Sequence, residues 1–163
     1  MALKNIELIK PSAEHGMPVN QLVASCPPLD TNSVYCNLLQ ADHFSETSVS
    51  AMLEDRLVGF ISGYLIPNRT DTLFVWQVAV GEAARGRGLA KKMLSSVLER
   101  PACSDVAYIE TTITQSNEAS WALFRSIAKQ LDAPLEDTVQ YDKDSHFQGK
   151  HDTEFLVRIG PFQ

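Results

Sequence analysis

The sequence predicts a single mixed α/β domain over residues 1–163, of the α+β type with helices around a mixed sheet. Hydrophobic residues recur at every second position in some segments and at every third or fourth in others, which indicates both strands and helices. In chain order these segments run β-α-α-β-β-β-α-β-α-β-β. No repeat, low-complexity stretch or linker divides the 163 residues, and a chain of this length commonly forms one domain.

The first third of the chain is predicted to hold one strand and two helices. Apolar and polar residues alternate over 6–8, as is typical of a short strand. Ser12 is a suitable N-cap for a first helix, although Gly16 favours a later start, and Pro27-Pro28 ends that helix. After a polar loop over 29–33, apolar residues at helical spacing predict a second helix.

The middle of the chain is predicted to form three consecutive strands. From Thr47 the hydrophobic period changes to two, which predicts a hairpin with strands over 49–53 and 57–66 and a turn at Asp55-Arg56. Residues 72–80 follow as an apolar run rich in β-branched and aromatic side chains. Such a run is typical of a central strand.

The last third of the chain returns to alternating helices and strands. Leu89, Met93 and Val97 lie at helical spacing, and Phe124 and Leu131 are expected to face inward from a later helix. The full prediction is a helix ending near Pro101, a strand over 106–113, a helix from Ser116 or Asn117, and two weaker strands over 138–141 and 154–159. The polar stretch 142–153 separates the last two strands.

Composition and charge exclude several classes of function. The net charge is −6 and the pI is about 5.1, which disfavours nucleic acid or an anionic membrane as the main partner. No apolar run approaches the ~18 residues of a membrane span, and the N-terminus lacks the pattern of a secretion signal. Cys26, Cys36 and Cys103 form no CxxC pair. We therefore expect reduced, mostly buried thiols in a cytoplasmic protein, with no metal site.

The segment from Val78 to Ala90 joins a predicted strand to a predicted helix and is suited to hold phosphate. Gly86 and Gly88 allow a ligand to approach the backbone closely, and the helix start presents unpaired N–H groups to an anion. Arg85 and Arg87 add positive charge. The segment lacks the spacing of a P-loop and of the GxGxxG dinucleotide motif. The structural alternative is a flexible turn with two solvated arginines.

The motif Arg85-Gly86-Arg87-Gly88-Leu89-Ala90 fits the Q/R-x-x-G-x-G/A loop of the GCN5-related N-acetyltransferase superfamily, and the sequence resembles that superfamily along nearly the whole chain. The resemblance implies the acyl-CoA N-acyltransferase fold with splayed central strands and acetyl-CoA as cosubstrate. It implies that the loop amides, from Arg85 to Ala90, hold the pyrophosphate of coenzyme A. It also implies that Val78 and Val80 hydrogen-bond the pantetheine arm.

The resemblance extends to the helix predicted from Asn117, because many members begin this helix with a cofactor-binding asparagine. Seven residues later many members carry a tyrosine that protonates the departing thiolate, and here that position is Phe124. We expect Phe124 to be a core residue. A thiol with a pKa of about 8.5 can leave as thiolate near neutral pH, and water, Tyr108 or Tyr141 could supply a proton instead.

Two polar stretches could bind an amine substrate. Asp30 and Tyr35 could grip an ammonium group, although Asp30 or Ser33 could equally cap a helix and Tyr35 could be a packed aromatic residue. Trp76 on the central strand could form an aromatic wall, although such residues are more often core. His151 lies three residues before Glu154, so the carboxylate could orient the imidazole or act as a base itself.

These stretches resemble one branch of the superfamily, the enzymes that acetylate L-2,4-diaminobutyrate in ectoine biosynthesis. The resemblance implies transfer to the 4-amino group, with Asp30, Tyr35, Trp76 and Glu154 lining the diamine pocket and His151 beside it. It implies Glu154, directly or through water or His151, as the base, and a homodimer as the assembly. The alternatives are an acetyltransferase of the same superfamily acting on a polyamine, an aminoglycoside or a protein lysine, and a non-catalytic acyl-CoA sensor.

Overall fold

The structure is a computed structural model that describes residues 5–162. Its chain divides into two compact units. The first unit comprises the described part of Met1–Leu65 together with Val75–Ser104. The second comprises Ile66–Phe74 together with the described part of Asp105–Gln163. The single domain expected over 1–163 stays a prediction.

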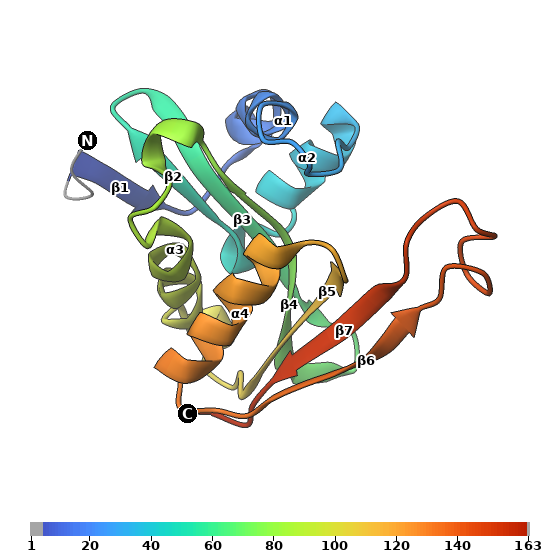
Figure 1. The fold of residues 1–163 in the computed structure, drawn as a ribbon. Helices are drawn as coiled ribbons and strands as arrows, with labels where there is room; N and C mark the ends of the chain where they lie inside the picture. The colour runs from blue at the N-terminus through green and yellow to red at the C-terminus, as the bar shows by residue number, and fades with distance from the viewer. Residues whose placement is uncertain (1–4, 163) are drawn as a thin grey trace. The chain divides into compact units, whose positions relative to one another are not determined.

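Every helix and strand that the sequence predicts is present, in the predicted order (Figure 1). In chain order the elements are β1 (Ile6–Ile9), η2 (Ala13–His15), α1 (Gly16–Ala24), α2 (Val34–Ala41), η3 (Ser45–Thr47), β2 (Val49–Leu53), β3 (Arg56–Ile66), β4 (Arg69–Val80), η4 (Glu82–Ala84), α3 (Leu89–Leu98), η5 (Pro101–Cys103), β5 (Tyr108–Thr114), α4 (Glu118–Gln130), β6 (Leu135–Tyr141) and β7 (Glu154–Ile159). The strands follow the order β1-β2-β3-β4-β5-β7-β6, and β4 contributes residues to both units. None of the helices in the described residues is both long and apolar enough to cross a membrane.

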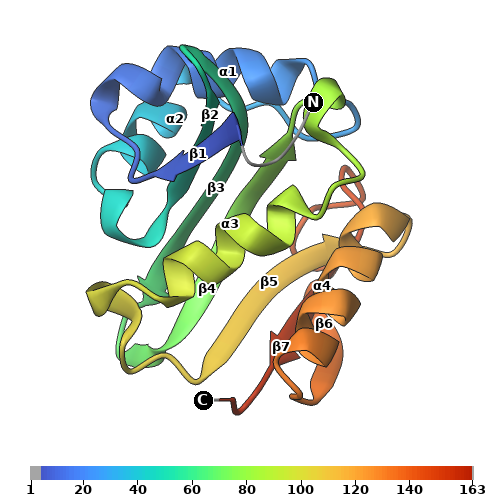
Figure 2. The same ribbon diagram turned by 90° about the vertical axis from the view of Figure 1, so that its left-hand side faces the viewer.

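The first unit is a layered structure, with α1 and α2 on one face of its strands and α3 on the other (Figure 2). β1 pairs antiparallel with β2, and β2 with β3. On the α3 face, a methyl group added at Gly59 would lie 3.1–3.2 Å from Met93 of α3. This close contact explains why a glycine stands in the middle of β3.

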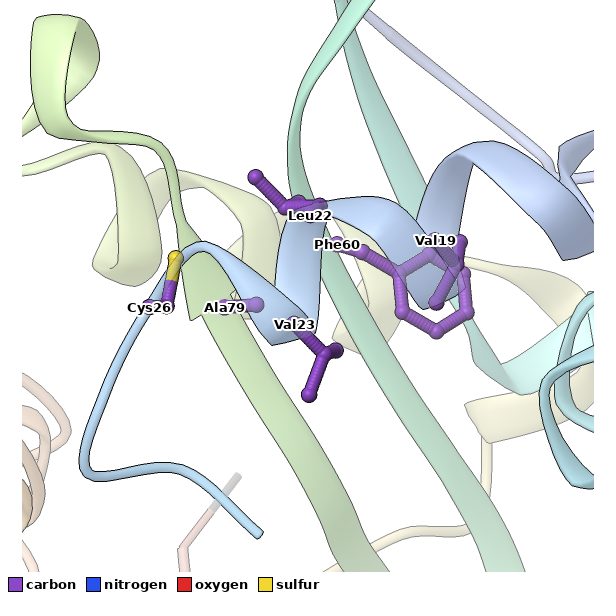
Figure 3. Close-up of a cluster of buried hydrophobic side chains, with 6 residues drawn as sticks. All are labelled: Val19, Leu22, Val23, Cys26, Phe60 and Ala79. Carbon is purple, nitrogen blue, oxygen red and sulfur yellow. The ribbon is translucent and has the colours of Figure 1, made fainter. Parts of the chain in front are cut away.

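A cluster of buried apolar side chains anchors α1 to β3 and β4 (Figure 3). Its members are Val19, Leu22, Val23, Cys26, Phe60 and Ala79. Burying a side chain of the size of Val19 or Phe60 stabilises the fold by roughly 1.5–3 kcal/mol. The cluster fixes the end of α1, and with it the point at which the loop over 27–33 begins.

The second unit contains β5, β7 and β6, which pair antiparallel in that order, together with the first half of β4. Thr72–Phe74 of β4 pairs in parallel with Tyr108–Glu110 of β5. α4 lies on this sheet, where the ring of Trp121 contacts that of Phe155 at a centroid distance of 6.4 Å. The loop between β6 and β7 extends beyond the ends of both strands (Figure 1).

Element boundaries differ from the predicted ones where side chains outside the element decide them. Ser12 caps the short helix η2, and α1 begins at Gly16. A Cβ at Gly16 would collide with the side chain of Leu38, so this glycine allows α1 and α2 to approach closely. β4 and β6 begin earlier than predicted, at Arg69 and Leu135, because strand pairing continues there through polar, exposed residues that carry no alternating pattern.

Candidate functional site

The loop between β4 and α3 has the backbone conformation that its glycines predict. Gly86 and Gly88 adopt φ values of +75° and +72°, in the left-handed region that other residues enter only at a cost. No heavy atom lies within 4 Å of a Cβ built at either position, so both glycines border open space. Gly88 is also the N-cap residue of α3. The first amides of α3 therefore have no intrahelical partners and can bind an anion.

Positive charge surrounds the start of α3. Arg85 and Arg87 are exposed, and Arg85 Nε donates a hydrogen bond to the carbonyl of Val80 at 3.0 Å. The first turn of α3 has no acidic residue and instead carries Lys91 and Lys92, which the sequence analysis did not select. Cations near a helix N-terminus are unfavourable unless an anion is bound there. Their position in the first turn of a predicted helix is the sequence signal by which Lys91 and Lys92 could have been identified.

Two of the predicted cofactor residues, Val78 and Val80, lie half-buried on β4. Side chains alternate along a strand, so both face away from Ala79, which belongs to the core cluster. The carbonyl of Val80 accepts hydrogen bonds from Arg85 Nε and from Cys26 Sγ, at 3.0 and 3.4 Å. This carbonyl is thereby tied to the loop on one side and to the end of α1 on the other.

The loop before α2 displays its polar side chains to solvent. Ser33 caps α2 by accepting a hydrogen bond from Cys36 N at 3.0 Å, so the cap is Ser33 and not Asp30. Asp30 is exposed, and Tyr35 is 69% exposed, which excludes the alternative of a packed aromatic residue. The Nδ2 atom of Asn32 donates to Gln77 Oε1 at 2.9 Å and ties the loop to β4. The structure thus brings the loop to the strand that carries Trp76.

Trp76 belongs to a group of three aromatic rings. It is 40% exposed, and its ring meets those of Phe44 and Tyr64 edge-on at centroid distances of 6.0 and 5.8 Å. Phe44 and Tyr64 lie 5.6 Å apart. Such a group offers an apolar surface with an electron-rich face, which attracts cations. The sequence analysis missed this grouping because the three residues come from separate elements.

In the second unit the structure brings His151 and Glu154 together. His151 Nε2 lies 4.0 Å from Glu154 Oε1, and the two side chains are 35% and 20% exposed. His151 Nδ1 is 2.6 Å from the carbonyl oxygen of Asp152, so Nδ1 carries a proton and donates it. A neutral ring then has an unprotonated Nε2, which faces the carboxylate side. The 4.0 Å separation is too long for a hydrogen bond, so proximity alone makes the two groups a candidate acid-base pair.

Asn117 and Phe124 occupy the helix positions that the sequence analysis assigned to them. Asn117 caps α4, and its Oδ1 accepts from Ser120 N at 3.2 Å. Phe124 is 3% exposed, which confirms that it is a core residue. The guanidinium carbon of Arg158 lies over the ring of Tyr108, 3.8 Å from the ring centroid. Tyr141, in contrast, is 45% exposed at the end of β6.

A hollow of about 410 Å³ lies in the second unit at the start of α4. Its wall includes Gln115 and Ser116 before the helix, and Lys143, Asp152 and Thr153 from the loop between β6 and β7. Within residues 5–162, no group of three or more His, Cys, Asp or Glu side chains is arranged to hold a metal ion. The three cysteines are free thiols, and Cys26 and Cys103 are buried, as the sequence predicts.

Known proteins match this chain over nearly its whole length. Residues 18–128 match the acetyltransferase (GNAT) family. An L-2,4-diaminobutyric acid acetyltransferase of Methylotuvimicrobium alcaliphilum is 59% identical, over 99% of this chain and 94% of the relative. A protein of the same description from Chromohalobacter salexigens is 48% identical, over 99% and 84% of the two chains.

Solved structures agree with these matches. One is the diaminobutyrate acetyltransferase EctA from Paenibacillus lautus in complex with its substrate L-2,4-diaminobutyric acid and coenzyme A. It matches with a TM-score of 0.91 and 40% identity, over 97% of this chain and 96% of that one. Naa50 from Arabidopsis thaliana, with 18% identity and a TM-score of 0.68 over 94% and 97% of the chains, shares the fold.

Proposed function

Since the chain belongs to the acetyltransferase (GNAT) family, we propose that it transfers the acetyl group of acetyl-CoA to the 4-amino group of L-2,4-diaminobutyrate. The product is N4-acetyl-L-2,4-diaminobutyrate, an intermediate of ectoine biosynthesis. One observation carries the proposal: a relative solved with diaminobutyrate and coenzyme A matches 97% of this chain at a TM-score of 0.91. The high identity of the diaminobutyric acid acetyltransferases supports it.

The loop from Arg85 to Ala90 is proposed to hold the diphosphate of coenzyme A. Its left-handed glycines border open space, and the N-terminus of α3 supplies unpaired amides. Arg85 and Arg87 add charge, while Leu89 anchors the helix in the core. Val78 and Val80 are proposed to bind the pantetheine arm through their backbone, and Asn117 to contact the cofactor at the start of α4.

The diamine is proposed to bind at Asp30, Tyr35, Trp76 and Glu154. Diaminobutyrate carries two ammonium groups and one carboxylate, so two carboxylates and an aromatic face are suitable partners. Asp30 and Tyr35 are exposed to an incoming ligand, and Trp76 presents its ring beside Phe44 and Tyr64.

Acetyl transfer requires that the attacking nitrogen loses a proton. An alkyl ammonium with a pKa of about 10.4 is almost fully protonated near neutral pH. We assign Glu154 as the proton acceptor, with His151 as the relay beside it. The free amine attacks the thioester carbonyl, and backbone N–H groups near Val78 stabilise the oxyanion. The C–S bond then breaks, and the attacking nitrogen releases its second proton to water as the amide forms. Coenzyme A leaves as thiolate and takes up a proton from water, Tyr108 or Tyr141, since Phe124 has no hydroxyl.

Substituting Glu154 tests the assignment of the base. Glu154→Gln is expected to lower kcat by about a hundredfold or more, because general base catalysis commonly contributes 10²–10⁴-fold. The remaining activity should rise with pH up to the pKa of the amine. Asp152→Asn is a matched control, since its side chain is exposed and its backbone carbonyl, which the change keeps, makes the contact with His151. An unchanged kcat and pH profile for Glu154→Gln would exclude Glu154 as the base.

Product analysis tests the proposed function as a whole. Acetyl-CoA and diaminobutyrate should give a product heavier by one acetyl group, and its fragmentation should place that group on the 4-nitrogen. Release of coenzyme A with spermidine, an aminoglycoside or a lysine peptide but not with diaminobutyrate would favour another acetyltransferase of the family. Binding of acetyl-CoA without thiol release for any amine would indicate a sensor.

The assembly is proposed to be a homodimer, from the family resemblance, and its location the cytoplasm, from the cysteine usage. Light scattering coupled to gel filtration should give twice the chain mass of 18.0 kDa. A mass of 18.0 kDa at micromolar concentration would reject the dimer.

A further inference from the structure

A continuous set of side-chain amides runs through the first unit. Asn32 Nδ2 donates to Gln77 Oε1 at 2.9 Å, and Asn20 Nδ2 donates to the backbone carbonyl of Asn32 at 3.0 Å. Asn20 Nδ2 also donates to Asn37 Oδ1 at 3.1 Å, and Asn37 Nδ2 donates to Gln40 Oε1 at 2.9 Å. These five residues, which we call the amide network, connect α1, the loop over 27–33, α2 and β4.

The amide network is buried at a cost that its hydrogen bonds must offset. Asn37 and Gln40 are 0% exposed, and Gln77 is 9% exposed. Moving an amide from water into the interior costs roughly 1–3 kcal/mol of free energy if the amide is left without hydrogen-bond partners. Gln40 Nε2 has no hydrogen-bond partner among the described residues, but the connected hydrogen bonds of the other amide groups still favour one arrangement of their backbone segments over others.

Three members of the amide network are close in sequence to the residues proposed to bind the diamine, and they lie on the buried sides of the same segments. Asn32 is two residues after Asp30, Asn37 is two residues after Tyr35, and Gln77 directly follows Trp76. The Asn32–Gln77 hydrogen bond joins the loop that carries Asp30 to the strand that carries Trp76. Asn20 joins the loop to α2 through the two hydrogen bonds that its Nδ2 donates.

We infer that the amide network sets the positions of Asp30, Tyr35 and Trp76 relative to one another, so that Asn20, Asn32 and Gln77 are positioning residues for the amine substrate. The inference rests on the proposed function, because it concerns the proposed diamine surface. The network acts on the affinity for the amine and leaves the diphosphate loop and the proton acceptor unchanged.

Two variants of Gln77 separate the hydrogen bond from the volume of the side chain. Gln77→Leu keeps the size and removes the acceptor, whereas Gln77→Glu keeps an acceptor for Asn32 Nδ2. Gln77→Leu and Asn32→Ala should each raise the KM for diaminobutyrate by roughly five- to tenfold, as expected for one hydrogen bond. The KM for acetyl-CoA and kcat should stay within about twofold, and Gln77→Glu should recover most of the loss.

Hydrogen exchange supplies a readout that does not depend on turnover. In Gln77→Leu and Asn32→Ala, amides of residues 29–35 should exchange faster than in the wild type. Ser50→Ala is the matched control, because it removes another part-buried hydrogen bond of the first unit, from Ser50 Oγ to His15 Nδ1 at 2.9 Å. The control should leave both the amide exchange of residues 29–35 and the KM for diaminobutyrate unchanged.

Three results would overturn the inference. The first result is an unchanged KM for diaminobutyrate in both variants. The second is a uniform loss of kcat and of affinity for both substrates that follows a loss of stability. The third uses 1,3-diaminopropane, which is diaminobutyrate without its carboxylate. If Gln77→Leu weakens only diaminobutyrate, Gln77 binds the carboxylate directly. Wild-type protein that does not acetylate diaminobutyrate would instead reject the proposed function, and hydrogen exchange alone would then decide what the network holds.

Discussion

At the scale of single residues, predictions from the sequence succeed where the required property is local. Gly86 and Gly88 could be assigned to a ligand loop because a positive φ and an unobstructed backbone are properties of glycine itself. Gln77 could not be assigned, because its partner Asn32 lies 45 positions away and an isolated glutamine on a strand carries no signal. The exposure of Tyr35 was equally hidden, since helical spacing alone cannot distinguish a packed from an exposed tyrosine.

The left-handed glycines give a prediction with an internal control. Gly88→Ala and Gly149→Ala each place a Cβ at positive φ, at +72° and +76°, and neither Cβ would meet a close neighbour. Both should therefore lower the free energy of unfolding by about 1 kcal/mol, measured by denaturant titration. Only Gly88→Ala should also raise the KM for acetyl-CoA several-fold. An equal effect of both variants on that KM would show that the loop conformation at Gly88 is not specific to the cofactor.

His15 gives a prediction for pH. Burial lowers the pKa of His15 below its ordinary value of 6.5, and its Nδ1 accepts from Ser12 N at 3.4 Å, which needs an unprotonated nitrogen. The folded state therefore binds this proton less readily than the unfolded chain does. The stabilisation is present above pH 6.5 and is lost as the pH falls from 6.5 toward the lowered pKa.

The measurement is the urea midpoint of unfolding between pH 7.5 and 5. The midpoint of the wild type should fall more steeply than that of His15→Gln, which keeps an acceptor but does not titrate. His43→Gln, at an exposed position, should follow the wild type. Parallel curves for the wild type and His15→Gln would contradict the prediction.

At the scale of elements, strands and helices with a clear apolar period were predicted correctly, and the deviations lie at their polar ends. β6 shows the physical reason. Its residues are nearly all exposed, so no burial pattern marks them, and its hydrogen bonds to β7 alone define it. Ser12 was a sound N-cap prediction, but it caps η2, and α1 begins at Gly16, where the absence of a side chain leaves room for Leu38.

A buried carboxylate joins β4, β5 and β7, and it gives a prediction at this scale. Glu110 is 3% exposed; Arg69 donates to it twice, at 3.1 and 3.0 Å, and Arg158 donates to it from β7. Arg69→Met or Arg158→Met leaves one cation in place. The double variant leaves a buried charge unpaired, so it should lose about 3–5 kcal/mol of unfolding free energy, more than the sum of the single losses.

A double-mutant cycle by denaturant titration measures this coupling. Lys10→Met, which breaks an exposed ion pair with Glu46, is the control and should cost less than about 1 kcal/mol. Additive effects of the two arginine changes would show that solvent, and not the arginines, balances the charge of Glu110.

At the scale of the whole molecule, the family and the fold could be predicted because one short motif coincided with the right order of elements. The proposed site could be predicted only by resemblance. Its candidates come from residues 30, 76, 86 and 154, which no single segment contains, and an acidic composition cannot name a diamine. The amide network and the aromatic group of Phe44, Tyr64 and Trp76 depend on tertiary contacts, and sequence periodicity does not report these.

Binding of acetyl-CoA should stabilise the folded protein as a whole. At a ligand concentration of 100 times Kd the gain is about 2.7 kcal/mol, which corresponds to a rise in Tm of about 5–10 °C for a chain of this size. S-acetylpantetheine, which lacks the diphosphate, should give a much smaller rise in a thermal shift assay. Equal shifts for the two ligands would show that the diphosphate contributes little to binding.

The exposed strand β6 has a consequence for the behaviour of the protein in concentrated salt. It lies at the edge of the sheet and displays Val139 and Tyr141, while Glu136 and Asp137 add negative charge to the same strand. Like charges keep such edges of neighbouring molecules apart over about 10 Å at 0.1 M salt but only about 3 Å at 1 M. The colloidal stability of this protein should therefore decline as ionic strength rises, because molecules then associate through the exposed strand β6.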